Sequence, residues 1–460
     1  MTMEWVKLLS THRLKPRKPS STSTVAGDRR NEFDRDSDRI VYSTPFRRLQ
    51  DKTQVFPLEP IDFVRTRLTH SLEVSHAAQG LAKDACRALV EQKRLKSIQA
   101  GQVETIAATC GLMHDLGNPP FGHSGELAIS GWFELEKNKA LLQDLAGAHR
   151  GDFLHFEGNA QTLRLVTRLQ VLADFHGLDL TCGTLSAAIK YTPGSDELAR
   201  EDQKRHERSK VGFFASERQT VEKIRSETGT GKARNPIAFL VEAADDAAYN
   251  TVDLEDGLKK GLLDWASLTS ELRLLAPGDA CLEECIAWAV GRIEGEVALK
   301  GRGKDEAIVQ YFRVRAIGQI IMAAAKAFLK HHDAIMEGDY HGELVEDSDA
   351  AALVKACRNV NRSRVYCSEE TLKLELMGRK MIWDLMDIFW EGAADPDPKK
   401  GSFARKAQDL FSANYRRVFE KALEEKQLPE QYGRLQLVTD YVCGMTDTFA
   451  AELHRRLMNG

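Results

Sequence analysis

The sequence predicts an all-α fold, and two observations support this prediction. Beyond residue 39, apolar residues recur mostly at three- and four-residue spacing, which is the period of an amphipathic helix. Only TQVFPL (53–58) is typical of a short strand. Hydrophobic residues make up 42% and charged residues 29% of the 460 residues, which is ordinary for a folded chain that buries a large core.

The expected helices follow one another with few interruptions. The periodicity is clearest over 72–92, 103–117, 159–175, 235–263 and 307–329, and three more helices are expected before the C-terminus. The most apolar stretch, AIGQIIMAAAKAFL, is broken by Gln and Lys, so it predicts a buried helix and not a membrane span of ~20 apolar residues.

Three segments interrupt the helical pattern. Residues 15–39 are rich in Ser, Thr, Arg and Asp and predict an arm or loop. Residues 194–234 are dense in charge and predict a mobile excursion, and 391–402 (EGAADPDPKKGS) predict a linker or turn. The resulting division is an N-terminal arm (1–34), a core with the charged excursion (35–265) and a C-terminal helical region (266–460).

Charge and cysteine usage narrow the class of protein. The net charge of −4 means that any nucleic-acid binding depends on a local basic patch. The N-terminus lacks a secretory signal, so we expect a cytoplasmic protein. The eight cysteines form no CxxC pair, and Cys281 and Cys285, four residues apart on one helix face, are expected to be reduced, buried thiols.

A candidate metal site centres on His114 and Asp115, which close an apolar helix that two prolines then end. Adjacent helical residues point ~100° apart, so one ion reaches both only with ligands from elsewhere in the chain. His70 and Asp245 are the candidates, and Asp245 lies in an otherwise apolar run where an unpaired carboxylate is costly. Two imidazoles and two carboxylates suit Mn²⁺, Mg²⁺, Ni²⁺, Fe²⁺ or Zn²⁺.

The strings around these residues resemble the dGTP triphosphohydrolase (dGTPase) family of HD-domain phosphohydrolases. The ordered set H…HD…D resembles the HD signature. The flanking strings are RDSDRIVYSTPFRRLQDKTQVF (35–56), VRTRLTHSLEVS (64–75), HDLGNPPFGHSGE (114–126), FEGNAQTLR (156–164), IKYTP (189–193) and EAADDAAYNTVDLEDG (242–257). The resemblance is close over residues 30–260 and loose beyond. It implies an HD-domain helical fold with an additional C-terminal helical lobe.

The resemblance assigns the ion to His70, His114, Asp115 and Asp245, with Mn²⁺ or Mg²⁺ as the expected metal. It also implies a catalytic pair, His123 and Glu126, whose i, i+3 spacing puts them on one helix face. An imidazole oriented by a carboxylate is a proton-transfer unit.

Substrate contacts carry over from the same resemblance. The expected contacts are Arg67, Lys190 and Tyr191 to the triphosphate, Tyr249 and Asp253 to the sugar, and Leu49 and Gln50 to the base. For a further set, a substrate contact and a plain structural role stay open: Arg47, Arg48, Asn118, Asn159, Glu375 and 415–417.

The implied reaction is metal-dependent hydrolysis of dGTP or another dNTP at the α-phosphorus, giving a deoxynucleoside and tripolyphosphate. His123 is the candidate acid for the departing 5′-oxygen. One alternative is another HD phosphohydrolase, a nucleotidase or phosphodiesterase. Another is a regulatory protein that binds dNTPs or single-stranded DNA along basic segments such as Arg29–Arg30. The resemblance also implies a homo-oligomer, often a hexamer, with nucleotides or single-stranded DNA as effectors at secondary sites.

Overall fold

The computed structural model describes residues 2–16, 28–58, 64–170, 175–198, 205–295, 300–426 and 428–459. Within these ranges the named elements are all helices, which confirms the all-α prediction. The strand expected at 53–58 is wrong. Thr53 makes an isolated antiparallel bridge to Thr66, and the residues after it form bends and a turn, because no neighbouring strand is there to extend the pairing.

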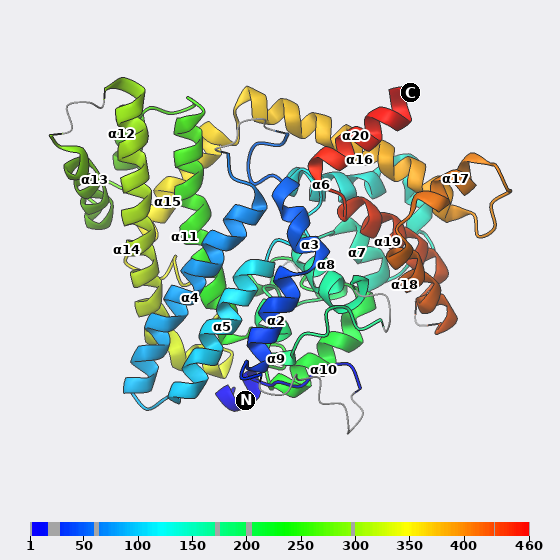
Figure 1. Ribbon diagram of the computed structural model, residues 1–460, viewed down its shortest axis with the longest axis horizontal. Helices are drawn as coiled ribbons and strands as arrows, with labels where there is room; N and C mark the ends of the chain where they lie inside the picture. The colour runs from blue at the N-terminus through cyan, green and yellow to red at the C-terminus, as the bar shows by residue number, and fades with distance from the viewer. Residues whose placement is uncertain are drawn as a thin grey trace.

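One group of helices packs around the largest hydrophobic cluster. Its main members are α4 (Arg67–Glu91), α5 (Ser97–Met113), α11 (Pro236–Lys259) and α14 (Gly301–Glu337). α4, α11 and α14 run side by side in the left half of Figure 1. α11 is buried on nearly every face, and its buried residues include carboxylates such as Glu242 and Asp253 as well as apolar side chains.

A second cluster joins a helix that follows the HD motif to the C-terminal helices. It contains α6 (Gly122–Glu134), α16 (Glu369–Ala394), α19 (Glu430–Cys443) and α20 (Asp447–Asn459). These helices lie in the upper right of Figure 1 and bury large aromatic side chains such as Trp132, Phe389 and Tyr432. The C-terminal region therefore packs directly on the helix that begins beside His123.

The remaining helices surround these two clusters. They are α1 (Trp5–Leu8), α2 (Glu32–Val41), α3 (Thr44–Arg48), α7 (Ala148–Leu154), α8 (Gly158–Arg164), α9 (Cys182–Ala188), α10 (Arg218–Thr228), α12 (Trp265–Leu275), α13 (Ala280–Ile293), α15 (Ala351–Val360), α17 (Phe403–Leu410) and α18 (Ala413–Glu424). No helix in the described parts of the chain has both the length and the apolarity to cross a membrane. All eight cysteines are free thiols; Cys285 is buried as expected, whereas Cys281 is only partly buried.

The loop expected over 15–39 is wrong from Glu32 onward, where α2 begins. The Asn31 side chain caps this helix by accepting hydrogen bonds from Phe33 N (2.8 Å) and Asp34 N (2.9 Å). Phe33 and Ile40 are buried on one face, while the Arg- and Asp-rich face that suggested a loop is the helix's polar side. Residues 17–27 lie outside the described residues.

The charged excursion is an ordered, packed segment wherever the structure describes it. α10 lies within it and buries Val221 and Ile224, and Phe213 is also buried. Residues 199–204 lie outside the described residues. The turn expected at 391–402 begins later than predicted, because α16 continues to Ala394.

Arg164 at the end of α8 ties the N-terminal half of the chain to the C-terminal helices. Its Nε and Nη2 donate to the two carboxylate oxygens of Asp440 in α19, at 2.9 and 2.7 Å. Its Nη1 donates to Glu217 Oε1 at 2.9 Å. The three side chains are 7%, 2% and 0% exposed, so each charge depends on the others for compensation.

We expect Arg164→Met to lower the free energy of unfolding by about 3–5 kcal/mol, because it leaves two buried carboxylates without their cation. Urea unfolding followed by circular dichroism measures the loss. The control is Arg455→Ala, which removes an exposed pair with Glu452 (2.9 Å) and should cost less than about 1 kcal/mol. Equal stability of the two variants would contradict the role given to Arg164.

Candidate functional site

A cavity of about 690 Å³ lies where the two helix clusters meet. This volume is in the range of small-molecule sites, ~300–1,000 Å³. Most of the predicted site residues line it: Arg67, His70, His114, Asp115, His123, Glu126, Lys190, Tyr191, Asp245, Tyr249 and Asp253. Residues distant in the sequence therefore meet at one concave surface.

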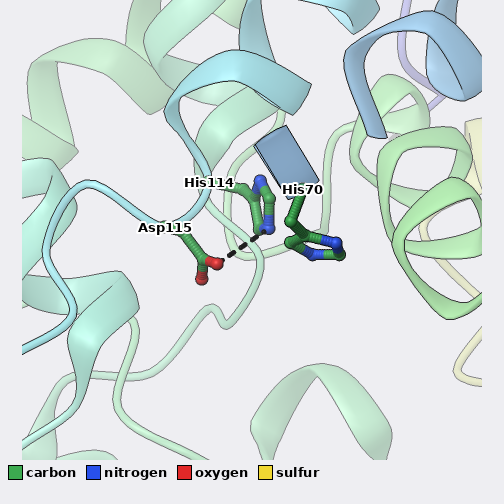
Figure 2. A group of neighbouring side chains, drawn as sticks. All are labelled: His70, His114 and Asp115. Carbon is green, nitrogen blue, oxygen red and sulfur yellow. Dashed lines mark ion pairs between the residues drawn. The ribbon is translucent and has the colours of Figure 1, made fainter. Parts of the chain in front are cut away.

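The four predicted metal ligands lie together in the lining of the cavity. His70 comes from α4, His114 and Asp115 from the turn directly after α5, and Asp245 from α11. His70, His114 and Asp115 offer ligand atoms within 4.8 Å of one another (Figure 2). Asp245 Oδ1 lies 3.1 Å from His70 Nε2 and 3.7 Å from His114 Nε2.

The donor set fits a divalent cation. His114 Nδ1 donates to the Gly111 carbonyl at 2.8 Å, which directs Nε2 toward Asp115 and Asp245. Burial lowers the pKa of His114, but the charges of Asp115 and Asp245 outweigh it and raise the pKa to about 9. A mixed imidazole and carboxylate cluster at negative potential suits a divalent transition metal or Mg²⁺.

Arg67, one helical turn before His70, holds Asp115 from the side. Its Nη1 donates to Asp115 Oδ2 at 2.6 Å, and the Asn118 amide donates to the other carboxylate oxygen. Gly122 leaves room for this guanidinium, since a Cβ there would lie 2.7 Å from Arg67 Nη2. Arg67 thus stands beside the metal ligands with part of its guanidinium facing the cavity.

His123 and Glu126 form the hydrogen-bonded pair that their spacing predicts. His123 Nδ1 and Glu126 Oε2 are 2.8 Å apart, and Glu126 Oε1 accepts a hydrogen bond from Gly158 N at 2.9 Å. Glu126 is buried, whereas the His123 side chain is 80% exposed toward the cavity. The hydrogen bond and charge of Glu126 raise the pKa of His123, which favours a protonated imidazole.

A group of cations lines another wall. Lys190 Nζ lies 3.5 Å from Glu242 Oε1, and both ring nitrogens of His206 face carboxylates, Glu242 at 2.7 Å and Glu343 at 2.9 Å. Lys210 Nζ lies 3.2 Å from Glu157. His206 and Lys210 could not be predicted from the sequence, because they lie in the charged segment, where nothing in their spacing separates them from a solvated surface.

A third wall combines α11 with the C-terminal region. Tyr366 donates from Oη to Asp253 Oδ2, and Arg358 lies 3.9 Å from Asp246. Burial raises the pKa of Asp253 to about 7, although the hydrogen bond from Tyr366 lowers it. Of the C-terminal residues that line the cavity, Glu375 is a candidate from the sequence, whereas Arg358 and Tyr366 are not.

The structure does not bring Leu49 and Gln50 to the cavity. Leu49 is fully buried in a hydrophobic cluster with Ile40 and Phe46, and Gln50 is exposed. The segment 53–57 just after them contributes to the lining instead.

The other open candidates divide between the cavity and the rest of the fold. Asn118 and Asn159 line the cavity. Tyr415 is buried in the second cluster, and Arg48 donates to the Gly444 carbonyl at 2.8 Å, so both have structural partners away from the lining.

His206 gives a pH-dependent prediction. Burial lowers its pKa, but the hydrogen bonds to Glu242 and Glu343 outweigh it and raise the pKa to about 9. Its contribution to folding is therefore complete below pH 6.5 and lost as the pH rises through about 9. We expect His206→Gln to lower the free energy of unfolding by roughly 2–3 kcal/mol at pH 6, and by much less at pH 9.5.

Denaturant unfolding of wild type and variant at several pH values measures this difference. His76→Gln, which replaces an exposed histidine of α4, is the control and should show no such trend. A difference that is constant from pH 6 to 9.5 would contradict the doubly paired imidazolium.

Comparison with known proteins places this site in a family. The HD domain model matches residues 67–168, and the phosphohydrolase-associated domain model matches residues 344–456. The first range holds His70, His114, Asp115 and the His123–Glu126 pair. The second holds the C-terminal wall of the cavity.

Relatives match over almost the whole chain. A deoxyguanosinetriphosphate triphosphohydrolase-like protein of Listeria innocua is 35% identical, covering 99% of both chains. One of Synechocystis is 34% identical, again over 99% of both. The deoxyguanosinetriphosphate triphosphohydrolase of Serratia proteamaculans is 33% identical over 93% of this chain and 94% of its own. The chain therefore belongs to the dGTP triphosphohydrolase family of HD-domain phosphohydrolases and is a hydrolase.

Proposed function

We propose that the chain is a metal-dependent triphosphohydrolase that converts dGTP or another dNTP to a deoxynucleoside and tripolyphosphate. The observation that carries this proposal is the shared cavity, in which the His–Asp cluster and the His123–Glu126 pair face a wall of cations. The names of the relatives support a deoxynucleoside triphosphate as substrate.

His70, His114, Asp115 and Asp245 would hold the cation, which we propose to be Mn²⁺ or Mg²⁺. When bound, such an ion supplies an activated water and positive charge for a phosphoryl oxygen. Arg67 compensates the charge of Asp115 at 2.6 Å and leaves the rest of its guanidinium for a phosphate.

Lys190, His206 and Lys210 bind the triphosphate in this proposal. The three charged groups are held in position before the substrate binds, because each is paired with a carboxylate of Glu242, Glu343 or Glu157. Preorganised cations stabilise developing charge without reorganising during the reaction.

His123 donates a proton to the departing 5′-oxygen. The Glu126 carboxylate bonds Nδ1 and leaves Nε2 as the donor toward the cavity, while the bond from Gly158 N keeps Glu126 from rotating. His123 thus lies in the first turn of α6, close to the metal cluster in sequence and in space.

Tyr249 and Asp253 share one face of α11, at four and eight residues after Asp245. We place the sugar here, with Asp253 near its 3′-hydroxyl and the Tyr249 ring where a 2′-hydroxyl would otherwise lie. Tyr366 holds Asp253 and closes this wall from the C-terminal side.

Product analysis tests the proposal. We expect each active dNTP, incubated with Mn²⁺ or Mg²⁺, to give a deoxynucleoside and intact tripolyphosphate on anion-exchange chromatography, and chelation to abolish turnover. His70→Ala should abolish activity, whereas His76→Ala, which replaces an exposed histidine six residues further along α4, should not change it. Monophosphate plus pyrophosphate as products, or no turnover with any metal, would refute the proposal.

Substitution of the proposed acid gives a second prediction. We expect His123→Ala to lower kcat by about 10²–10⁴-fold with little change in KM, because proton donation acts in the transition state. Glu126→Gln still accepts the Gly158 hydrogen bond but loses its charge, so a smaller loss is expected. Steady-state kinetics on both variants measures these losses. A wild-type kcat for His123→Ala would show that His123 is not the acid.

A further inference from the structure

The loop of residues 116–122 joins the metal ligands to the proposed acid. It starts directly after Asp115 and ends at the first residue of α6, one residue before His123. The conformation of this loop therefore sets how far His123 stands from the metal cluster.

The loop contains an unfavourable backbone conformation at Phe121. Its φ is +64°, in the left-handed region, and the next residue, Gly122, has φ +59°. A bulky residue keeps such a conformation only where its surroundings hold it, and residues of this kind gather at functional sites. Phe121 also lines the cavity.

Asp447, the first residue of α20, supplies one of these restraints. Its Oδ1 accepts a hydrogen bond from Phe121 N at 2.9 Å, and its Oδ2 accepts one from Thr53 N at 3.0 Å. The hydroxyl of Thr53 donates to Oδ2 as well. Asp447 is only 2% exposed, so these donors are its compensation for burial.

α16 supplies a second restraint. Its Gly378 lies directly against the Phe121 ring, and a Cβ there would be 2.7 Å from Phe121 Cγ. The absence of a side chain at this position lets the ring fit between α6 and α16, where it belongs to the second hydrophobic cluster.

The end of α19 restrains the first half of the loop. The Lys52 ammonium donates to the carbonyl of Asn118 and, at 3.1 Å, to that of Cys443, the last residue of α19. Cys443 Sγ lies 3.1 Å from the Gly117 carbonyl. A buried cation at a helix carboxyl end is favourable, and here it joins that end to the loop.

We propose that Asp447 is a positioning residue for the reaction: it holds the amide of Phe121 in the left-handed conformation and thereby places His123 over the metal cluster. This inference rests on the proposed function. In this proposal the C-terminal helices contribute to proton transfer by positioning His123, although none of their residues donates the proton.

The test separates proton donation from folding and metal binding. A dNTP analogue with sulfur in place of the bridging 5′-oxygen leaves as a thiolate, and thiols are far more acidic than water, with a pKa of about 8.5 against about 15.7. Its hydrolysis needs little help from an acid. Misplacement of His123 should therefore slow the natural substrate and spare the analogue.

We expect Asp447→Ala to lower kcat on the natural dNTP by about 10²-fold with KM little changed. The analogue should be hydrolysed at close to the wild-type rate, as it should be by His123→Ala. The matched control is Asp152→Ala, which removes a carboxylate that is 3% exposed and accepts hydrogen bonds from Ala215 N and two hydroxyls away from the loop. This control should not change the ratio of the two rates.

If the Asp447→Ala variant hydrolyses the natural dNTP at the wild-type rate, or if its rates on both substrates fall equally, the inference is overturned. The proposed function is unaffected by either result. Full activity of His123→Ala on the natural substrate overturns the acid assignment and the inference together. If Asp447→Ala does not fold, Gly378→Ala carries the same test, because it displaces the Phe121 ring from the other side. Its expected result is the same selective loss, and an unchanged ratio overturns the inference.

Discussion

A buried carboxylate needs a partner, and this requirement connects the site to the rest of the molecule. Asp115 is held by Arg67, Glu242 by Lys190 and His206, and Asp440 by Arg164. Each pair joins segments that are far apart in the sequence. These ion pairs therefore compensate the buried charges and also hold the helices together around the cavity.

The cavity is completed by a region that contributes no predicted metal ligand. Arg358, Tyr366 and Glu375 form one of its walls, and Asp447 restrains the loop between Asp115 and His123. The two family models match these two parts of the chain separately. The HD region alone would thus hold three of the four proposed metal ligands and the acid, but it would lack both Asp245 and the contacts that orient the loop.

Periodicity and motif spacing predicted the all-α fold, and the predicted ligands and acid pair do meet at one cavity. The failures have physical causes. TQVFPL contains residues that favour strands, such as Thr, Val and Phe, but it has no neighbouring strand to pair with. The Arg- and Asp-rich face of α2 suggested a loop, although Phe33 and Ile40 are buried on its other face. His206 and Lys210 lie in a segment whose charges resemble a solvated surface, because pairing with Glu242 and Glu157 is a tertiary event that local spacing does not record.

The lining of the cavity poses an electrostatic problem, since it carries more carboxylates than lysines and arginines, yet its proposed substrate is a polyanion. The pairing pattern resolves it. Glu126, Glu157 and Glu242 are each engaged by a cationic or imidazole partner, and burial raises the pKa of Asp246 and Asp253 to about 7. Asp115 and Asp245 both face the His114 imidazole, and a divalent cation bound there would add positive charge beside the triphosphate. In the proposed function, metal binding would therefore favour substrate binding, because the bound cation would offset the charge of the triphosphate.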